Sequence, residues 1–93
     1  MRGRIRIDGR KHVETSKGFP IIIYLTKDRK EKLILTGYHS KKEHWDKANA
    51  LPLKKHPNFL DLLNYLEFKK IKLKRLLDKA KHEEIPFAFA EQY

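Results

Sequence analysis

Three arginines at alternate positions near the start of the chain have the spacing that most clearly suggests chemistry. Successive side chains of a β-strand point to opposite faces, so Arg2, Arg4 and Arg6 would share one face, about 6.6 Å apart. Ile5 and Ile7 would share the other face and enter a core. Arginine recognises phosphates and base edges, and no acid interrupts the row, so the pattern favours phosphate or base contact. A solvated face that merely uses arginine is the alternative.

A second strand pair follows. The apolar, β-branched runs Ile21–Thr26 and Leu33–Thr36 flank the polar segment Lys27–Glu31, which predicts a β-hairpin. The tip places three basic residues within four positions, so one end of the sheet is expected to meet a negatively charged partner. These residues are Lys27, Arg29 and Lys30.

Alternation assigns the two faces of the second strand. Tyr24 and Thr26 lie on its more polar face, and that face is expected to lie beside Arg4 and Arg6. The third strand carries three apolar residues in succession at 33–35, so alternation leaves its inward face open. The residues predicted to enter the core from the second strand are Ile21, Ile23 and Leu25.

Charge is distributed unevenly along the 93 residues, which suffice for one domain with one small core. The net charge is +10 and the pI is near 9.9, which suits a polyanionic partner better than a small acidic substrate. Residues 1–57 hold 15 Lys/Arg against 6 Asp/Glu, whereas residues 58–93 hold 7 against 6. The excess of cations therefore belongs to the segment that forms the sheet.

The composition argues against several other classes of protein. The absence of cysteine excludes disulfides, a thiolate nucleophile and cysteine zinc sites, and the scattered histidines are expected to be solvated surface residues. We therefore predict no metal, no cofactor and no catalytic residue. No apolar run approaches the length of a membrane span, so a cytoplasmic location without a membrane partner is expected. The histidines are His12, His39, His44, His56 and His82.

The second half of the chain predicts a turn, a connector and a long helix. Ser40 and Glu43 have capping-box spacing, which predicts a helical turn at 40–45, and Trp45 is expected to plug the edge of the core. A basic connector at 46–57 precedes a helix at 58–84. Lys70 interrupts its apolar stripe, so close packing is expected only in the first half of the helix. The stripe comprises Phe59, Leu62, Leu63, Leu66, Leu73, Leu76, Leu77 and Ala80.

The predicted fold class is therefore α+β, with a three-stranded antiparallel β-sheet packed against one long C-terminal α-helix. The sheet spans 2–37, and the whole domain spans 1–84. Residues 85–93 are expected to be a tail or the start of a following domain. One helix can cover only one face of so small a sheet, so the arginine face is expected to stay free.

The order of these motifs resembles the N-terminal arm DNA-binding domain of phage- and transposon-type tyrosine recombinases (integrases). In that family a PIYLR-like strand, a basic turn, a strand ending in Thr-Gly and a Trp-Asp pair precede a helix with an Asn and Leu motif. The resemblance covers roughly residues 4–81. The residues that carry it are Phe19–Thr26 (FPIIIYLT), the tip Lys27–Glu31, Thr36-Gly37, Trp45-Asp46 and Leu63–Leu66 (LNYL).

The resemblance implies sequence-specific binding of double-stranded DNA, with the free sheet face in the major groove, at arm-type sites flanking a recombination core. The bound protein would associate with the nucleoid. Other integrase protomers would be contacted through domains that this sequence does not contain. The catalytic domain of these recombinases is also absent, so the fragment is expected not to be an enzyme, although its parent would be a tyrosine recombinase. The predicted DNA-binding residues are Arg2, Arg4, Arg6, Arg10, Lys11, Lys17, Tyr24, Thr26, Lys27, Arg29, Lys30 and Lys32.

The sequence departs from the family pattern at several sheet positions. Tyr24 stands where the family often has arginine, which weakens bidentate base reading at that position. Leu33 and Leu35 stand where polar residues are more usual, and matching to the family would bury Ile34 instead.

Two other classes of function compete with this interpretation. Asp8 together with Asp28 and Lys30 spells the D…D-x-K pattern of small metal-dependent nucleases, although Asp28 is also favoured at a hairpin tip for its turn chemistry. An RNA-binding or ribosome-associated module is the main alternative. Against that alternative, Tyr24 alone supplies an aromatic ring on the free face, where RNA platforms usually present several.

Overall fold

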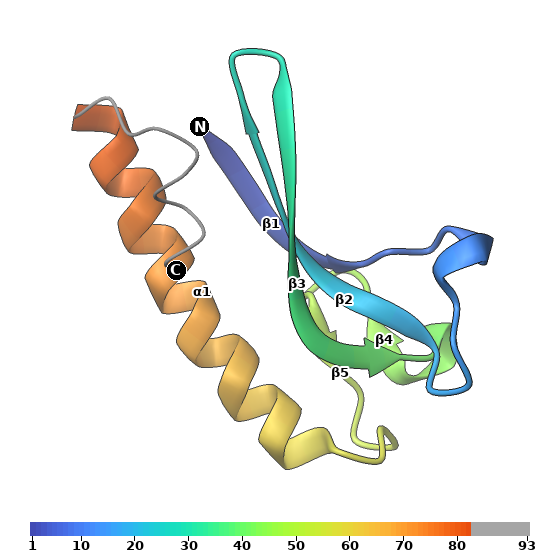
Figure 1. The fold of residues 1–93 in the computed structure, drawn as a ribbon. Coiled ribbons are helices and arrows are strands. Elements are labelled where there is room, and N and C mark those ends of the chain that lie inside the picture. Colours follow the sequence, from blue (N-terminus) through green and yellow to red (C-terminus); the bar gives the residue numbers. More distant parts are fainter. Residues whose placement is uncertain (83–93) are drawn as a thin grey trace.

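A three-stranded antiparallel sheet with one long helix along one side forms the structure (Figure 1), a computed structural model that describes residues 1–82. The predicted α+β class is confirmed. Residues 83 and 84 of the predicted helix and the predicted tail lie outside the described residues. The elements are β1 (Arg2–Ile7), β2 (Phe19–Lys27), β3 (Lys30–Ser40), β4 (Trp45–Asp46), β5 (Leu51–Pro52) and α1 (Phe59–His82), with 3₁₀ turns at Lys11–Val13 and Lys42–His44.

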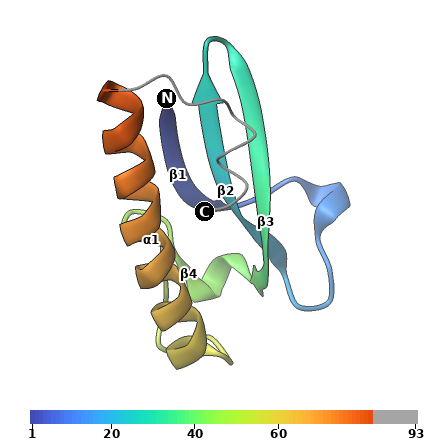
Figure 2. The ribbon, with the colours of Figure 1, turned by 60° about the vertical axis from the view of Figure 1, so that its left-hand side comes forward.

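The core lies between α1 and the face of the sheet formed by the odd-numbered residues of β1 and β2. In Figure 2, α1 runs alongside β1, and β2 and β3 lie farther from the helix in that view. Each fully buried leucine or isoleucine stabilises the fold by about 1.5–3 kcal/mol through the hydrophobic effect. The buried members of this core are Ile5, Ile21, Ile23, Leu25, Trp45, Leu62, Leu66, Leu73 and Leu76. All of them except Trp45 belong to the apolar patterns predicted for the first two strands and the helix.

β3 ends at Ser40, three residues beyond the predicted end of the sheet, because a bulge lets the strand continue. The pairing of β2 with β3 shifts between Pro20 and Ile22. In the bulge the Thr36 hydroxyl donates to the carbonyl oxygen of Ile21 at 2.7 Å, and Gly37 takes a left-handed φ of 83°. A bulge bends a strand and increases its twist. The lower part of the sheet in Figure 1 accordingly curves away from the helix.

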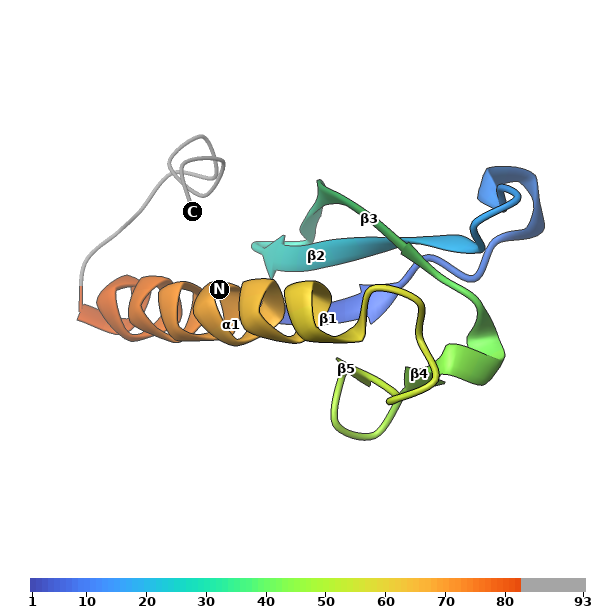
Figure 3. The same ribbon diagram turned by 90° about the horizontal axis from the view of Figure 1, so that it is seen from below.

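A small hairpin, β4–β5, begins at the last residue of the predicted turn and continues into the predicted connector, and the sequence did not reveal it. Figure 3 shows this hairpin beside the N-terminal part of α1. The carboxylate of Asp46 holds its turn by accepting hydrogen bonds from the Asn49 side chain and from the backbone amides of Asn49 and Ala48. These bonds, that of the Asn49 side chain above all, lower the pKa of Asp46. Trp45 is 6% exposed and belongs to the core, as expected. Ser40, however, donates to the carbonyl oxygen of Lys41 and caps no helix, so the predicted capping box is wrong.

The expectation that the helix packs closely only in its first half is also wrong. Leu73 and Leu76, both beyond Lys70, are buried in the same core as Leu62. Lys70 is half-buried, and its amino group donates to the carbonyl oxygen of Asn49 at 2.7 Å. Burial lowers the pKa of this lysine. The interruption of the stripe therefore ties α1 to the β4–β5 turn.

His56 likewise departs from the prediction that the histidines are solvated, since it is 7% exposed. Its Nε2 lies 2.9 Å from the carbonyl oxygen of His39, and its Nδ1 accepts a hydrogen bond from the Asn58 amide at 3.0 Å. A neutral ring with the proton on Nε2 satisfies both contacts. His56 therefore joins the end of β3 to the start of α1.

Helix and sheet approach each other closely at Gly3. A Cβ atom at this position would lie 2.6 Å from Cδ2 of Leu25 and 3.0 Å from Cδ1 of Leu73. Any larger residue must displace two side chains of a close-packed core.

No helix within residues 1–82 has the length and apolar character that crossing a bilayer requires.

Gly3→Ala is expected to destabilise the fold by about 1–3 kcal/mol, because overpacking pushes Leu25 and Leu73 apart. Gly9→Ala is the matched control, since its nearest neighbour would be the Lys42 side chain at 3.9 Å. Urea unfolding followed by the fluorescence of Trp45 measures both variants. Equal unfolding midpoints for Gly3→Ala and the wild type would contradict the packing described.

Candidate nucleic-acid interface

The face of the sheet opposite α1 presents a three-by-three grid of side chains. Each row takes one residue from each strand, because the strands pair in register across the sheet. Hereafter this surface is called the free face. Its rows are Arg2, Thr26 and Glu31, then Arg4, Tyr24 and Leu33, then Arg6, Ile22 and Leu35.

The β1 arginines occupy one edge of the free face, as the alternation predicts. All three are exposed, and within residues 1–82 none of their guanidinium groups forms an ion pair. The Tyr24 ring organises two of them, with the Arg6 guanidinium carbon 4.7 Å and that of Arg4 5.9 Å from the ring centroid. Cation–π contacts of this kind favour guanidinium groups that lie over the sheet. The result is a preformed cationic row with free hydrogen-bond donors.

Tyr24 is in turn positioned by an acid. A hydrogen bond from its hydroxyl to the Glu31 carboxylate raises the pKa of Tyr24, with desolvation and the negative charge of Glu31 acting in the same direction. Glu31 is the acidic member of the free face and lies across from Thr26, at the corner farthest from Arg6. It therefore fixes the aromatic ring without neutralising the arginine row.

The hairpin tip is a two-residue turn that strains an arginine. Asp28 and Arg29 have φ angles of 50° and 66°, as a type I′ turn between Lys27 and Lys30 requires. Asp tolerates this left-handed conformation comparatively well, whereas glycine is usual at the second position and a residue such as arginine costs about 1–2 kcal/mol there. Strain of this kind often marks functional positions. The turn between β2 and β3, which contains Arg29, lies at the far end of these two strands (Figure 1).

The tip lysines do not lie on the free face. By strand alternation, Lys27 follows Leu25 and Lys32 precedes Ile34, so both belong to the side that α1 packs against. The structure also settles the inward face of β3. Ile34 packs against the core, whereas Leu33 and Leu35 are exposed on the free face. Lys30 pairs with Lys27 and so belongs to the same side by alternation, and it is exposed at the end of the sheet.

The loop between β1 and β2 contains three predicted DNA-binding residues, of which one is paired with an acid and two are exposed. Arg10 is held by the buried Asp8 carboxylate through Nε–Oδ1 and Nη2–Oδ2 contacts of 2.8 and 2.6 Å. These contacts lower the pKa of Asp8 and raise that of Arg10. Arg10 therefore anchors the loop, and it is less available to a ligand than the exposed Lys11 and Lys17.

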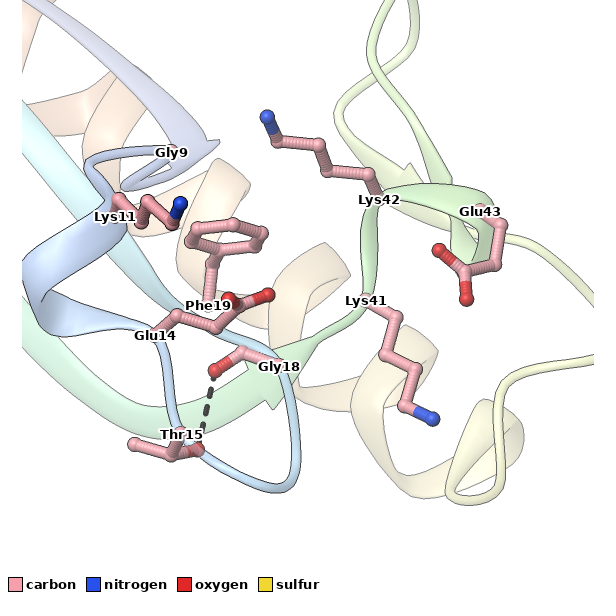
Figure 4. A pocket seen from close by; sticks show the side chains of 9 residues that line it. All are labelled: Gly9, Lys11, Glu14, Thr15, Gly18, Phe19, Lys41, Lys42 and Glu43. Carbon is pink, nitrogen blue, oxygen red and sulfur yellow. Dashed lines mark hydrogen bonds between the residues drawn. The ribbon is translucent and has the colours of Figure 1, made fainter.

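A pocket of mixed charge at the opposite end of the sheet from the tip was missed by the sequence analysis. Its charged lining residues are Lys11, Lys41, Lys42, Glu14 and Glu43. Figure 4 shows Lys11 and Lys42 reaching from two sides toward the buried ring of Phe19, whereas Lys41 points away. The Lys42 amino group lies 5.0 Å from the ring centroid. The adjacent Lys41-Lys42 pair in the sequence was the available signal. The end of the sheet opposite the tip therefore carries three lysines, Lys11, Lys41 and Lys42.

The nuclease pattern is not assembled in the fold. Asp8 follows β1, and its amide donates to Pro20 near the start of β2, whereas Asp28 follows the far end of β2. Arg10 also occupies both carboxylate oxygens of Asp8. Within residues 1–82, no group of three His, Asp or Glu side chains is arranged to hold a metal ion. The three residues of the pattern therefore do not form one site.

Comparison with known proteins identifies the family. The family model of the arm DNA-binding domain matches residues 9–91, and the chain belongs to this family. This family is a non-catalytic, DNA-binding module of the integrase type, and DNA is the partner that it indicates. No curated protein and no solved structure shows a significant match to the chain.

The Asp8–Arg10 pair predicts a specific pH dependence of stability. Because the pKa of folded Asp8 lies below its ordinary value of 3.8, the ionised carboxylate stabilises the fold above that value, and this contribution is lost as the pH falls through the folded-state pKa. Thermal unfolding at several pH values should show wild type and Asp8→Asn converging in strong acid and separating above about pH 4.

Asp78→Asn serves as the control, since Asp78 is an exposed carboxylate on α1. A constant difference between wild type and Asp8→Asn from strong acid to neutrality would contradict the assigned role of the carboxylate charge.

Proposed function

We propose that the chain anchors a phage- or transposon-type tyrosine recombinase to arm-type sites by placing the free face in the major groove of double-stranded DNA. The observation that carries the proposal is the exposed row Arg2, Arg4 and Arg6 on the one sheet face that α1 leaves uncovered. The major groove is about 12 Å wide and admits β-strands as well as a helix. The family supports DNA as the ligand.

The two arginines nearest Tyr24 are proposed to read bases. An arginine side chain donates two hydrogen bonds to O6 and N7 of guanine, and a good pair discriminates against the wrong base by about 1–3 kcal/mol. Arg6 suits this role because it is exposed, makes no ion pair within residues 1–82 and is oriented by the Tyr24 ring. Sequence reading would thus concentrate on β1 and the centre of β2.

Cations at the two ends of the sheet are proposed to contact phosphates. Arg29 and Lys30 extend from the tip, and Lys11 and Lys17 belong to the loop at the opposite end. Phosphate contacts of this kind supply affinity and its salt dependence, and they position the protein without reading sequence. Contacts with other integrase protomers and participation in recombination are part of the same proposal.

Arg6→Ala and Lys30→Ala are expected to fail in different ways. Arg6→Ala should weaken binding to a preferred duplex by about 1–3 kcal/mol and bring it toward the affinity for a scrambled duplex. Lys30→Ala should weaken binding to both duplexes about equally and reduce the slope of log affinity against log salt by about 1. Fluorescence anisotropy titrations at several salt concentrations measure both effects.

Lys79→Ala, an exposed lysine of α1, is the control for lost charge. If Arg6→Ala and Lys30→Ala reduce binding to both duplexes equally, the division between base-reading and phosphate-contacting residues is wrong. If single-stranded RNA competes better than duplex DNA, the RNA-binding alternative replaces the proposal.

Arg29→Gly separates stability from binding at the tip. Glycine relieves the left-handed strain but frees the unfolded chain, so the free energy of unfolding should stay the same or rise by up to about 1 kcal/mol. Duplex binding should weaken at the same time, because the outermost cation is lost. Urea unfolding and anisotropy on one preparation test both effects. A variant that binds DNA as tightly as wild type would remove Arg29 from the interface.

A further inference from the structure

The third strand gives the free face an apolar edge. Leu33 is 41% exposed and Leu35 is 74% exposed, and both lie on the side of the sheet that α1 leaves uncovered. Ile22, the neighbour of Leu35 on β2, is fully buried and adds no accessible surface, so the exposed apolar groups of the face lie along β3. The free face is therefore divided between a cationic strand and an apolar strand.

The positions of the leucines are fixed by the fold. They are two residues apart on one strand, so their side chains stand roughly 6.8 Å apart and project in the same direction. The core does not need them, because Ile34 supplies the contact of β3 with the core cluster. A partner that covers both leucines is expected to present apolar groups at a spacing that matches the spacing of these two side chains on β3.

We propose that Leu33 and Leu35 recognise the C5-methyl groups of thymine, so that the free face reads thymines along β3 and guanines along β1. This inference rests on the DNA binding proposed above. The thymine methyl is the apolar group on the base edges of the major groove, where the other base edges present hydrogen-bond donors and acceptors. A leucine pressed against those polar edges would bury them without partners, which costs free energy.

The electrostatics of the face favour DNA over a protein as the partner of the leucines. Both leucines share their rows with arginines, Leu33 with Arg4 and Leu35 with Arg6. An apolar protein surface laid on this face would have to bury exposed guanidinium groups with which no acid of residues 1–82 forms an ion pair. Duplex DNA meets both requirements, because its phosphates and guanines attract the arginines while its thymine methyls cover the leucines.

The separation of the outer strands makes the two kinds of reading independent. Neighbouring strands lie about 4.8 Å apart, so β1 and β3 are about 10 Å apart across the face. The rise between base pairs is 3.4 Å, so arginines and leucines face different bases. A preferred site is therefore expected to contain guanine and thymine at a fixed offset.

Replacement of thymine by deoxyuridine tests the inference, because it removes only the methyl group and keeps base pairing. A preferred duplex is first selected from a random pool, and each thymine is then replaced in turn. At one or two positions wild-type affinity should fall about fourfold per methyl lost, as expected for burial of one methyl-sized group. Leu33→Ser or Leu35→Ser should bind the thymine and deoxyuridine forms equally at those positions.

Leu60→Ser is the matched control, since Leu60 is 68% exposed on α1 and should leave the discrimination unchanged. If wild type binds the duplex in a salt-dependent manner but ignores every replacement, the thymine inference is overturned while the proposed function stands. Failure to bind any duplex overturns both. If the serine variants lose self-association in sedimentation but keep the discrimination against deoxyuridine, the leucines contact protein and the inference is also overturned.

Discussion

Burial of one face of a small sheet beneath a single helix is the constraint on which the rest of the structure depends. Three strands cannot bury both of their faces against one helix, so the side chains of opposite phase, apart from the buried Ile22, remain available to a ligand. The lack of room for a Cβ atom at Gly3, which would lie 3.0 Å from Cδ1 of Leu73, shows how closely helix and sheet approach on the buried side. On the other side, the same alternation aligns the arginines of β1 in a row.

The free face combines fixed geometry with uncompensated charge. The Tyr24 ring lies beside two guanidinium groups and is itself held by Glu31. Asp8 forms its ion pair with Arg10, which lies in the loop beyond β1 and outside the arginine row. The arginine row therefore keeps its charge for a partner. A polyanion lowers the repulsion within the row and gains donors that are already in place, which is how electrostatic complementarity assists association.

Sequence patterns predicted the parts of the molecule that repeat with a clear period. The Arg/Ile alternation of β1 and the leucine stripe of α1 each defined a face, and the basic segment between two apolar runs defined the tip. The β4–β5 hairpin has strands of two residues, which are too short to show a period. Burial of His56 and the contact of Lys70 with Asn49 depend on segments distant in the sequence, so no local pattern could reveal them.

The most direct test of the account is to map amide chemical shifts of the labelled protein during titration with duplex DNA. We expect the perturbed amides to belong to β1, the centre of β2 and the first half of β3, together with the tip at Asp28 and Arg29. Amides on the solvent side of α1, around Phe68 and Ile71, should stay unperturbed. Perturbations centred on α1 with an unaffected β1 would contradict the claim that the uncovered face of the sheet binds DNA.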